Sequence, residues 1–272
     1  MLHKRIAAIA AVALSALFGV SSADARTIDL GFSLDTSGSV GSADFAVART
    51  ALAQALSNIP TTGPVTYRIA VTKFSSSVTT VVPVTQITGA NIGAIQTAIA
   101  NTAFVGGATR TADAITTTFD LFAAVGLGDT TLINITTDGE PFEGTRVGAV
   151  QSQLNAEAAA LAAFNNGLDG LSFETVGTFS ATDLNNAARI AGFGTAGVAS
   201  NGVVLAPTDA IPDPTQTGFV LPVASFAGYS AAIDAKVEEV VINTQVVPLP
   251  AGLPLMLAGI AAFAFVRRRQ TG

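Results

Sequence analysis

Short segments rich in Leu, Ile and Phe alternate with longer amphipathic segments along most of this 272-residue chain. Residues 28–34 and 131–137 carry the short pattern, and we expect them to form buried strands of a parallel sheet. Residues 42–58 and 111–124 instead repeat apolar side chains at helical spacing. Strand–helix alternation over about 220 residues predicts one α/β domain with a doubly wound, mostly parallel central sheet flanked by helices.

The same patterns predict the bounds of the individual elements. Strands are expected at Ile28–Leu34, Val65–Phe74, Val78–Val84, Thr131–Thr137, Leu171–Phe179 and Phe219–Val223. Helices are expected at Ser42–Asn58, Ala90–Ala100, Thr111–Ala124, Arg146–Asn165, Asp183–Ala191 and Ser225–Ile242. The segment Gly192–Thr217 is rich in Gly, Pro, Thr and Asp, which is typical of irregular structure.

The two ends of the chain have a different composition from the centre. Met1–Ala25 has a basic start, an apolar stretch and a small-residue cleavage pattern at Ala23-Asp24-Ala25, which predicts a secretory signal peptide. The alternative, an uncleaved membrane anchor, requires a longer apolar run. Residues 246–272 combine a proline-rich start, a short apolar helix and a basic end. We therefore expect a signal peptide at 1–25, a folded domain at 26–245 and a separate C-terminal segment.

Composition excludes several classes of chemistry. The chain has no cysteine, and its one histidine, His3, lies in the predicted signal peptide. A mature chain without His or Cys cannot build the usual zinc site, a thiolate nucleophile or a Ser-His-Asp triad. Residues 26–247 contain 18 acidic and 8 basic residues, a net charge of −10. Such a surface repels nucleic acid, so no nucleic-acid partner is expected.

Three polar segments are expected to meet at one rim: Asp35–Ser39 and Thr136–Glu140 lie at the ends of strands, and Gly106–Thr111 is a glycine turn leading into a helix that can reach the same rim. The carboxyl ends of strands in an open α/β sheet form the crevice where ligands bind. Asp35, Ser37 and Ser39 offer the oxygen ligands that hard cations such as Mg²⁺ prefer. Taken alone, this pattern also fits an ordinary turn or helix N-cap.

Together, and in this order, the three segments resemble the von Willebrand factor A (vWA) domain family. The metal-ion-dependent adhesion site (MIDAS) of that family has an Asp-x-Ser-x-Ser motif, a Thr in a glycine-containing loop, and an Asp after the fourth strand. By position, the resemblance implies that the metal ligands are Asp35, Ser37, Ser39, Thr109 and Asp138. Thr111 is an alternative to Thr109, although the spacing from the Gly-Gly pair favours Thr109. The implied cofactor is Mg²⁺, or else Mn²⁺ or Ca²⁺.

The resemblance also implies roles for these ligands. The hydroxyls are expected to bind the ion directly, whereas Asp35 and Asp138 act mainly through bound water, which Mg²⁺ tends to retain. One open position would then accept an acidic group of a protein or polysaccharide partner. Arg110, beside Thr109, could gate or orient such a partner. Asp44 is not expected to be a ligand, because it lies in the first turn of a helix, where the helix dipole favours a negative charge. Glu140 is better explained as a residue on the rim of the site than as a ligand.

The C-terminal segment has a resemblance of its own. Val247-Pro248-Leu249-Pro250-Ala251, the apolar Gly252–Val266 and the terminal Arg267–Arg269 resemble the VPLPA variety of PEP-CTERM sorting signals. These signals occur on exported bacterial proteins and are recognised by exosortase-type membrane proteases. The resemblance implies a transient inner-membrane anchor, cleavage near Pro250, and release to the cell surface or matrix. An ordinary tail anchor is the alternative.

These expectations favour an exported, metal-dependent binding protein that is not an enzyme. Glycosidases use two carboxylates, so a hydrolase based on Asp138 and Glu140 is an alternative. Residues two apart on a loop rarely face each other across a substrate, which argues against it. A structural matrix protein with a stabilising metal site is a second alternative. A domain serving a cytoplasmic AAA-type chelatase is a third, and the predicted signal peptide argues against it.

Overall fold

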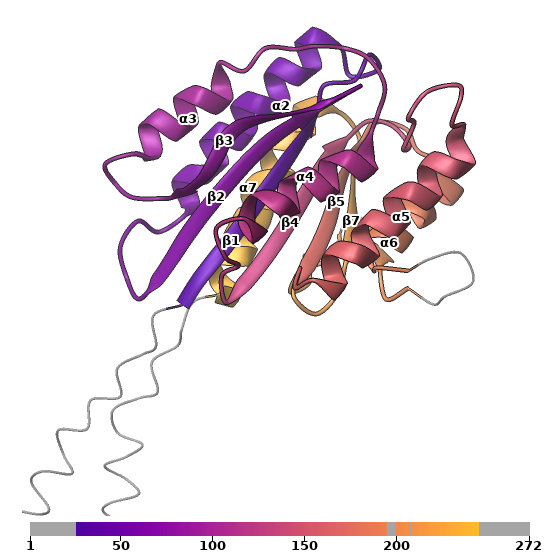
Figure 1. Cartoon of the computed structure of the whole chain (residues 1–272). Helices are drawn as coiled ribbons and strands as arrows, with labels where there is room; N and C mark the ends of the chain where they lie inside the picture. Colours follow the sequence, from indigo (N-terminus) through magenta and orange to yellow (C-terminus); the bar gives the residue numbers. More distant parts are fainter. Residues whose placement is uncertain (1–25, 195–199, 207, 245–272) are drawn as a thin grey trace, which may run out of the picture. The chain divides into compact units, whose positions relative to one another are not determined.

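A seven-stranded sheet lies at the centre of the fold, with its strands in the order β3-β2-β1-β4-β5-β7-β6 (Figure 1). The computed structural model describes residues 26–194, 200–206 and 208–244. The strands are β1 (Arg26–Asp35), β2 (Val65–Phe74), β3 (Val78–Gln86), β4 (Thr130–Thr137), β5 (Gly170–Val176), β6 (Val203–Val204) and β7 (Phe219–Val223). Every pair is parallel except β2 with β3, which confirms the predicted mostly parallel sheet.

Helices cover both faces of this sheet, as a doubly wound fold requires. One face packs against α2, α3 and α7, and the opposite face against α4, α5 and α6 (Figure 1). The helices are α2 (Gly41–Ala55), α3 (Ile92–Ala100), α4 (Thr111–Ala123), α5 (Ala149–Asn165), α6 (Ala181–Ala191) and α7 (Phe226–Thr244), and a 3₁₀ turn, η1 (Leu56–Asn58), extends α2.

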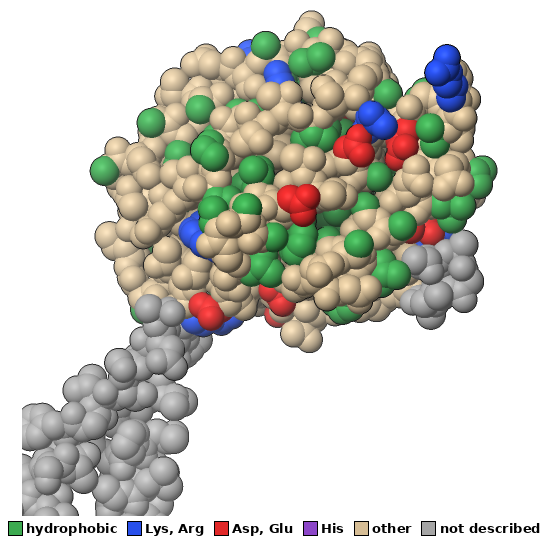
Figure 2. All heavy atoms as spheres, viewed as in Figure 1, with side chains coloured by type: hydrophobic (Ala, Val, Ile, Leu, Met, Phe, Trp, Pro, Cys, Tyr) green, Lys and Arg blue, Asp and Glu red, His purple; other side chains and the backbone are tan. Residues whose placement is uncertain are grey.

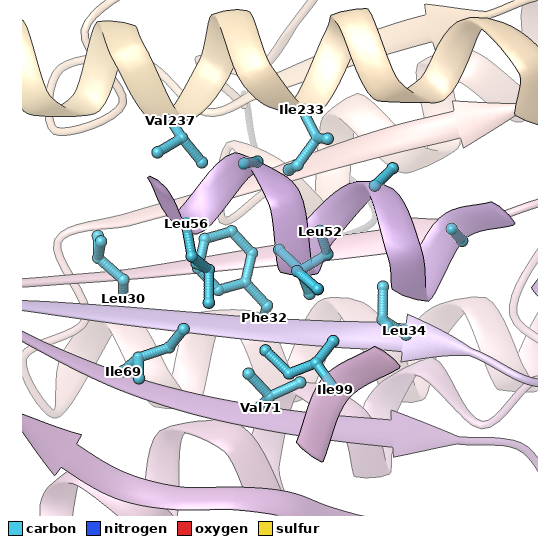
Figure 3. Packing of buried hydrophobic residues seen from close by; sticks show 14 of the residues in the cluster. Leu30, Phe32, Leu34, Leu52, Leu56, Ile69, Val71, Ile99, Ile233 and Val237 are labelled. Atoms are coloured by element: carbon cyan, nitrogen blue, oxygen red, sulfur yellow. The ribbon is translucent and has the colours of Figure 1, made fainter. Parts of the chain in front are cut away.

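The core on the first face is made by large aliphatic and aromatic side chains. Figure 3 shows Phe32 of β1 between the sheet and α2, close to Leu52 and Leu56, with Ile233 of α7 on the other side of α2. Leu52, Leu56 and Ile233 are fully buried. Burying one such side chain stabilises the folded state by about 1.5–3 kcal/mol, so this cluster ties α2 and α7 to the sheet.

The second face of β1 differs from the apolar strand that the sequence suggests. Residues 28–35 are buried on both faces, as expected, but the second face carries Asp29, Gly31 and Ser33. A Cβ added at Gly31 would lie 2.7 Å from Thr118 Cγ2 of α4, so α4 packs directly against the strand backbone. Thr72 of β2 donates a hydrogen bond to Ser33 and shares another with Thr118, both at 2.8 Å. Small and hydrogen-bonded residues therefore let α4 approach the centre of the sheet.

Other predicted bounds are close to those observed. β5 ends at Val176, the last residue that pairs with β7, rather than at Phe179. α5 begins at Ala149 rather than Arg146. Within the predicted irregular segment Gly192–Thr217, the structure places the short strand β6, which pairs with the start of β7. A strand of two residues leaves no periodic pattern in the sequence, so it was not predicted.

Both ends of the described domain lie at the end of the sheet where the parallel strands begin. β1 begins there, and α7 runs back from the end of β7 to the same edge (Figure 1). Across residues 26–194, 200–206 and 208–244, no helix is both long and apolar enough to cross a bilayer. The predicted signal peptide and sorting signal lie outside the described residues.

Candidate metal centre

Asp35 and Asp138 lie at the carboxyl ends of two neighbouring strands. β1 pairs with β4 in parallel, and the last pair is Leu34 with Thr136. Asp35 is the last residue of β1, and Asp138 follows the last residue of β4. The sheet therefore brings together two carboxylates that are about a hundred residues apart in the chain.

A series of hydrogen bonds connects the first segment to the third. Asp35 Oδ1 accepts a hydrogen bond from the Ser37 backbone N–H at 2.7 Å. The hydroxyl oxygens of Ser37 and Ser39 lie 3.0 Å apart. Ser39 Oγ then donates to Asp138 Oδ1 at 2.8 Å. Two hydroxyls and two carboxylates predicted as ligands therefore form one continuous polar cluster.

Thr137 is a member of this cluster that the sequence did not single out. Its hydroxyl donates a hydrogen bond to Asp35 Oδ2 at 2.6 Å. Both carboxylate oxygens of Asp35 therefore accept hydrogen bonds from the protein, which suits a carboxylate that acts on an ion through water. Thr137 is one of several threonines in β4, and nothing in the local sequence distinguishes it.

The glycine loop is held against the first segment by backbone hydrogen bonds. Gly38 N–H donates to Gly107 C=O at 3.0 Å, and Gly106 N–H donates to Thr36 C=O at 2.8 Å. Gly107 has a φ of +116°, and an added Cβ would clash with Ser76 Oγ, so only glycine fits. This loop delivers the next residues, including Thr109, to the same edge.

Thr109 pairs with Phe142, two residues beyond the third segment. It forms a two-residue antiparallel bridge with Phe142, in which each backbone N–H donates to the other's C=O at 2.8 Å. A Cβ added at Gly139 would lie 3.9 Å from Thr109 Oγ1 and 3.8 Å from Ser39 Oγ, so both hydroxyls lie beside Gly139. Thr111, the alternative, begins α4, and its buried hydroxyl has no hydrogen-bond partner.

Burial makes the two carboxylates difficult to ionise in the metal-free protein. Desolvation raises the pKa of Asp35 to about 7, against the hydrogen bonds from Thr137 and Ser37 that lower it. Desolvation also raises the pKa of Asp138, and the charge of Asp44 adds to the rise. A cation at this place would favour the ionised forms and reverse these shifts.

Asp35 differs from the other buried carboxylates of the described residues in its lack of a basic partner. Asp29, Asp35, Glu157 and Glu174 are each at most 3% exposed. Asp29 pairs with an arginine, Glu157 with an arginine and Glu174 with a lysine, each at 2.6 Å. Asp35 forms no ion pair with any described Lys or Arg. Buried charges in proteins are paired or coordinate metals, so its environment fits a cation.

The donor set fits a hard divalent cation. All of its side-chain donors are carboxylate or hydroxyl oxygens, which Mg²⁺, Mn²⁺ and Ca²⁺ accept. The described residues hold no group of three or more His, Cys, Asp and Glu side chains that could bind a metal without hydroxyls. An ion here would therefore depend on Ser37, Ser39 and Thr109.

The neighbouring charged residues lie around this cluster. Asp44 lies in the first turn of α2, as expected. Glu140 is exposed, and partial desolvation together with the nearby carboxyl group of Asp183 raises its pKa. Arg110 Nε lies 3.0 Å from Asp113 Oδ2, and its guanidinium also approaches the Ser76 carbonyl at 3.4 Å. Arg110 therefore has partners within its own chain.

Comparison with known proteins places the chain in a family. The model of the von Willebrand factor type A domain matches residues 29–196, which is more than half of the chain. The chain belongs to the vWA domain family. A search of curated proteins gives no significant match.

Solved structures share the vWA fold at low sequence identity. BatB from Bacteroides thetaiotaomicron is 15% identical with a TM-score of 0.53, over 80% of this chain and 100% of that one. The PilB minor pilin of Streptococcus sanguinis is 12% identical with a TM-score of 0.56, over 84% of this chain and 64% of the pilin.

Proximal thread matrix protein 1 from the mussel byssus is 16% identical with a TM-score of 0.52, over 79% of this chain and 46% of that protein. Its structure has a zinc-occupied MIDAS motif.

Proposed function

We propose that this is an exported bacterial surface or matrix protein whose vWA domain binds a partner through a divalent cation. The cation, Mg²⁺ or else Mn²⁺ or Ca²⁺, is held at a MIDAS formed by Asp35, Ser37, Ser39, Thr109 and Asp138. The observation that carries the proposal is the buried Asp35, which has no basic partner among the described residues and sits in a cluster of converging hydroxyls.

The residues divide into two roles. Ser37, Ser39 and Thr109 supply neutral oxygens, and Asp35 and Asp138 orient bound water and supply negative charge. Two carboxylates at best balance a divalent ion, so an acidic group of a protein or polysaccharide can complete the coordination. When bound, the cation supplies a Lewis-acidic position for that group.

We further propose that the protein is not an enzyme. Asp138 accepts a hydrogen bond from Ser39 and belongs to the metal cluster. Desolvation and the nearby Asp183 of α6 raise the pKa of Glu140, so its carboxyl group lies beside α6. The two carboxyl groups therefore do not form the facing pair that glycoside hydrolysis requires.

The proposals of export and sorting are based on the sequence of the two ends of the chain. We propose that a signal peptide ends at Ala25, and that an exosortase-type protease processes the VPLPA segment after a transient stay in the inner membrane. Intact-mass measurement of the surface form should give a chain that starts at Arg26 and lacks residues 252–272. A surface form that retains Arg267–Arg269 would instead indicate a permanent tail anchor.

The binding proposal is tested by capture of partners from intact cells with Mg²⁺ or with EDTA. Capture is expected in Mg²⁺ and should be lost in EDTA. The variant Thr109→Ala removes one neutral ligand and leaves the net charge unchanged, so it separates coordination from charge. It should fold normally and capture poorly.

The structural matrix protein is the alternative that this experiment distinguishes. In that case the ion only stabilises the rim of the domain, and surface attachment persists both in EDTA and in Thr109→Ala. That result would end the adhesion proposal.

A further inference from the structure

A cavity of about 250 Å³ lies at the end of the sheet opposite the candidate metal centre. Its lining comes from the residues just before β5 and β7 and from the ends of α5 and α6. Parallel strands begin at one end of a sheet and finish at the other, and Asp35 and Asp138 lie at the carboxyl ends. The cavity is therefore separate from the metal cluster, and its volume is close to the lower limit for ligand pockets, about 300 Å³.

The walls of this cavity are held by backbone contacts. Gly218 packs against the end of α6, where an added Cβ would clash with the Ala191 carbonyl. The turn before Gly218 is closed by Asp213, whose carboxylate accepts from the Thr215 N–H at 2.9 Å and from the Thr215 hydroxyl at 2.8 Å. The Asp213 carbonyl also accepts from the Gln216 N–H at 3.0 Å. The cavity is therefore preformed, which lowers the entropic cost of binding a ligand.

Two stacked phenylalanine rings make one side of the cavity. Phe164, at the end of α5, and Phe193, just after α6, have ring centroids 4.6 Å apart and an angle of 21° between the ring planes. Both residues line the cavity, and Phe164 is 48% exposed. The pair thus offers a flat aromatic surface that a ligand can reach.

Phe193 occupies a backbone position that usually favours glycine. Its φ is +56°, and it is the one described non-glycine residue with a positive φ. The Gly194 N–H donates to the Arg189 carbonyl at 2.8 Å, which closes the end of α6 around Phe193. Glycine is the usual residue at such a helix end, because a side chain is strained there. An aromatic ring held in spite of this strain points to a role for the ring itself.

Polar groups with spare hydrogen-bonding capacity line the same cavity. The side chains of Asn201 and Thr217 have no hydrogen-bond partner in the described part of the chain. Gln216 makes one weak contact, in which its Nε2 lies 3.4 Å from the hydroxyl of the preceding threonine. Asp169 uses one carboxylate oxygen to accept from the Thr131 N–H at 2.7 Å, and its second oxygen has no partner among the described residues. Donors and acceptors are therefore available beside an aromatic ring.

Charge narrows the class of ligand. Asp169 is the one charged residue in the described lining, so phosphate, sulfate and carboxylate groups meet a negative charge and no Lys or Arg. Charged side chains are also sparse on the face shown in Figure 2, where α5 lies. Recognition of an ammonium group uses rings arranged around it, whereas these two rings are stacked into one surface. A neutral ligand with several hydroxyls fits this cavity best.

We infer that this cavity binds a neutral sugar unit. The C–H groups on one face of a pyranose ring pack on Phe164, and the sugar hydroxyls exchange hydrogen bonds with Asp169, Asn201, Gln216 and Thr217. The free oxygen of Asp169 accepts from one hydroxyl, and a hydrogen bond to an ionised group is about twice as strong as a neutral one. This site goes beyond the proposed metal-dependent binding, and sugar binding here needs no divalent cation.

The test is calorimetric titration of the purified full chain in solution, with EDTA present. The neutral probes are cellotriose and triacetylchitotriose, the acidic probe is trigalacturonate, and the cationic probe is choline. At least one of the neutral trisaccharides should bind, and it should bind more tightly than trigalacturonate or choline.

Two variants test the two parts of the site. Phe164→Leu keeps an apolar side chain and removes the ring, and Asp169→Asn keeps an acceptor for the Thr131 N–H and removes the charge. Each should weaken binding of the neutral sugar about tenfold. The matched control for the second is Asp129→Asn, because the Asp129 carboxylate accepts from the Thr27 N–H at 2.7 Å in the same way but lies outside the cavity. This control should bind the sugar like wild type.

The matched control for the ring is Phe142→Leu, at another phenylalanine that is 38% exposed and lies outside the cavity. It should also bind the sugar like wild type. Melting temperatures of all four variants check that each one folds.

The inference fails if neither neutral trisaccharide binds, or if Phe164→Leu and Asp169→Asn both bind it as tightly as wild type does. Tighter binding of choline or of trigalacturonate would overturn it in favour of a cationic or an acidic ligand. None of these results touches the proposed function, because Phe164→Leu should retain the full Mg²⁺-induced rise in melting temperature. Sugar binding in EDTA by a chain that captures no partner in Mg²⁺ would instead support the inference and end the proposed function.

Discussion

Asp35 is the residue on which ion binding and stability depend most directly. It is 3% exposed, and desolvation raises its pKa to about 7 in the metal-free protein. A proton or a cation can each remove the cost of its buried charge. Proton and metal therefore compete for the same carboxylate, which links the stability of the domain to pH and to metal concentration.

The metal-free protein should lose stability as the pH rises from about 4 to about 7. Over this range the unfolded Asp35, with the ordinary pKa of 3.8, loses its proton while the folded Asp35 keeps it. The folded state then binds more protons, so the free energy of unfolding falls with rising pH. Thermal melts in EDTA across this range should show a falling melting temperature.

Asp35→Asn is the control for this pH dependence, since an amide keeps the shape of the side chain and does not titrate. Its melting temperature should change less with pH than that of wild type. Asp138, whose pKa is also raised, contributes in the same direction and remains in the variant. Equal pH dependence in the two proteins would exclude Asp35 as the source.

Thr109 and Thr111 allow a second test at the scale of single residues. A cation that binds only the folded state stabilises it by about 2.7 kcal/mol at a hundredfold excess over Kd. Thr109→Ala should largely abolish the Mg²⁺-induced rise in melting temperature, because Thr109 Oγ1 and Ser39 Oγ both lie beside Gly139. Thr111→Ala removes the same chemical group from a neighbouring buried position and should retain the rise. The reverse result would assign the ligand to Thr111.

At the scale of elements, α7 is joined to the sheet by a buried ion pair as well as by apolar packing. Lys236 Nζ lies 2.6 Å from Glu174 Oε1 of β5, and both side chains are at most 4% exposed. Asn134 of β4 donates to the other oxygen of Glu174. Tyr229 of α7 shares a hydrogen bond with Thr136 at 2.8 Å. These contacts fix the position of α7 against β4 and β5.

Removing one member of this pair should strongly destabilise the folded state, because the other charge is left buried without a partner. Lys236→Met should lower the free energy of unfolding by about 3–5 kcal/mol. Lys73→Met is the matched control, since Lys73 is partly exposed and donates to the Ala103 carbonyl, a hydrogen bond from a charged group that is worth about 1.5 kcal/mol. Denaturant titration measures the free energy of unfolding of both variants. Similar losses would mean that the buried ion pair contributes no more to stability than the exposed hydrogen bond of Lys73.

At the scale of the whole molecule, the strand–helix alternation predicts every described strand except β6 and every described helix. It also predicts the shared edge for Asp35 and Asp138, because parallel strands end on the same side. The local pattern contains no information on which distant residues become partners. Thr137 at Asp35 and Phe142 at Thr109 were therefore missed.

The buried ion pairs show the same limit over longer separations. Asp29 binds Arg68, and Glu174 binds Lys236 62 residues further on. Each pair exists because the sheet places two elements side by side, and a single sequence gives no signal for it. The sequence of β1 suggested an apolar strand, whereas its second face holds Asp29 and Ser33 with hydrogen-bonded partners.

The start of β1 and the end of α7 share the edge opposite the carboxyl ends of the parallel strands. The 19 residues of α7 span about 28 Å, which separates that edge from the metal cluster. A fluorophore, affinity tag or sensor surface coupled directly at Arg26 or Thr244, the ends of the described domain, is therefore remote from Asp35 and Thr109. The orientation of an immobilised domain can thus be chosen in advance, with its binding face directed toward the solution.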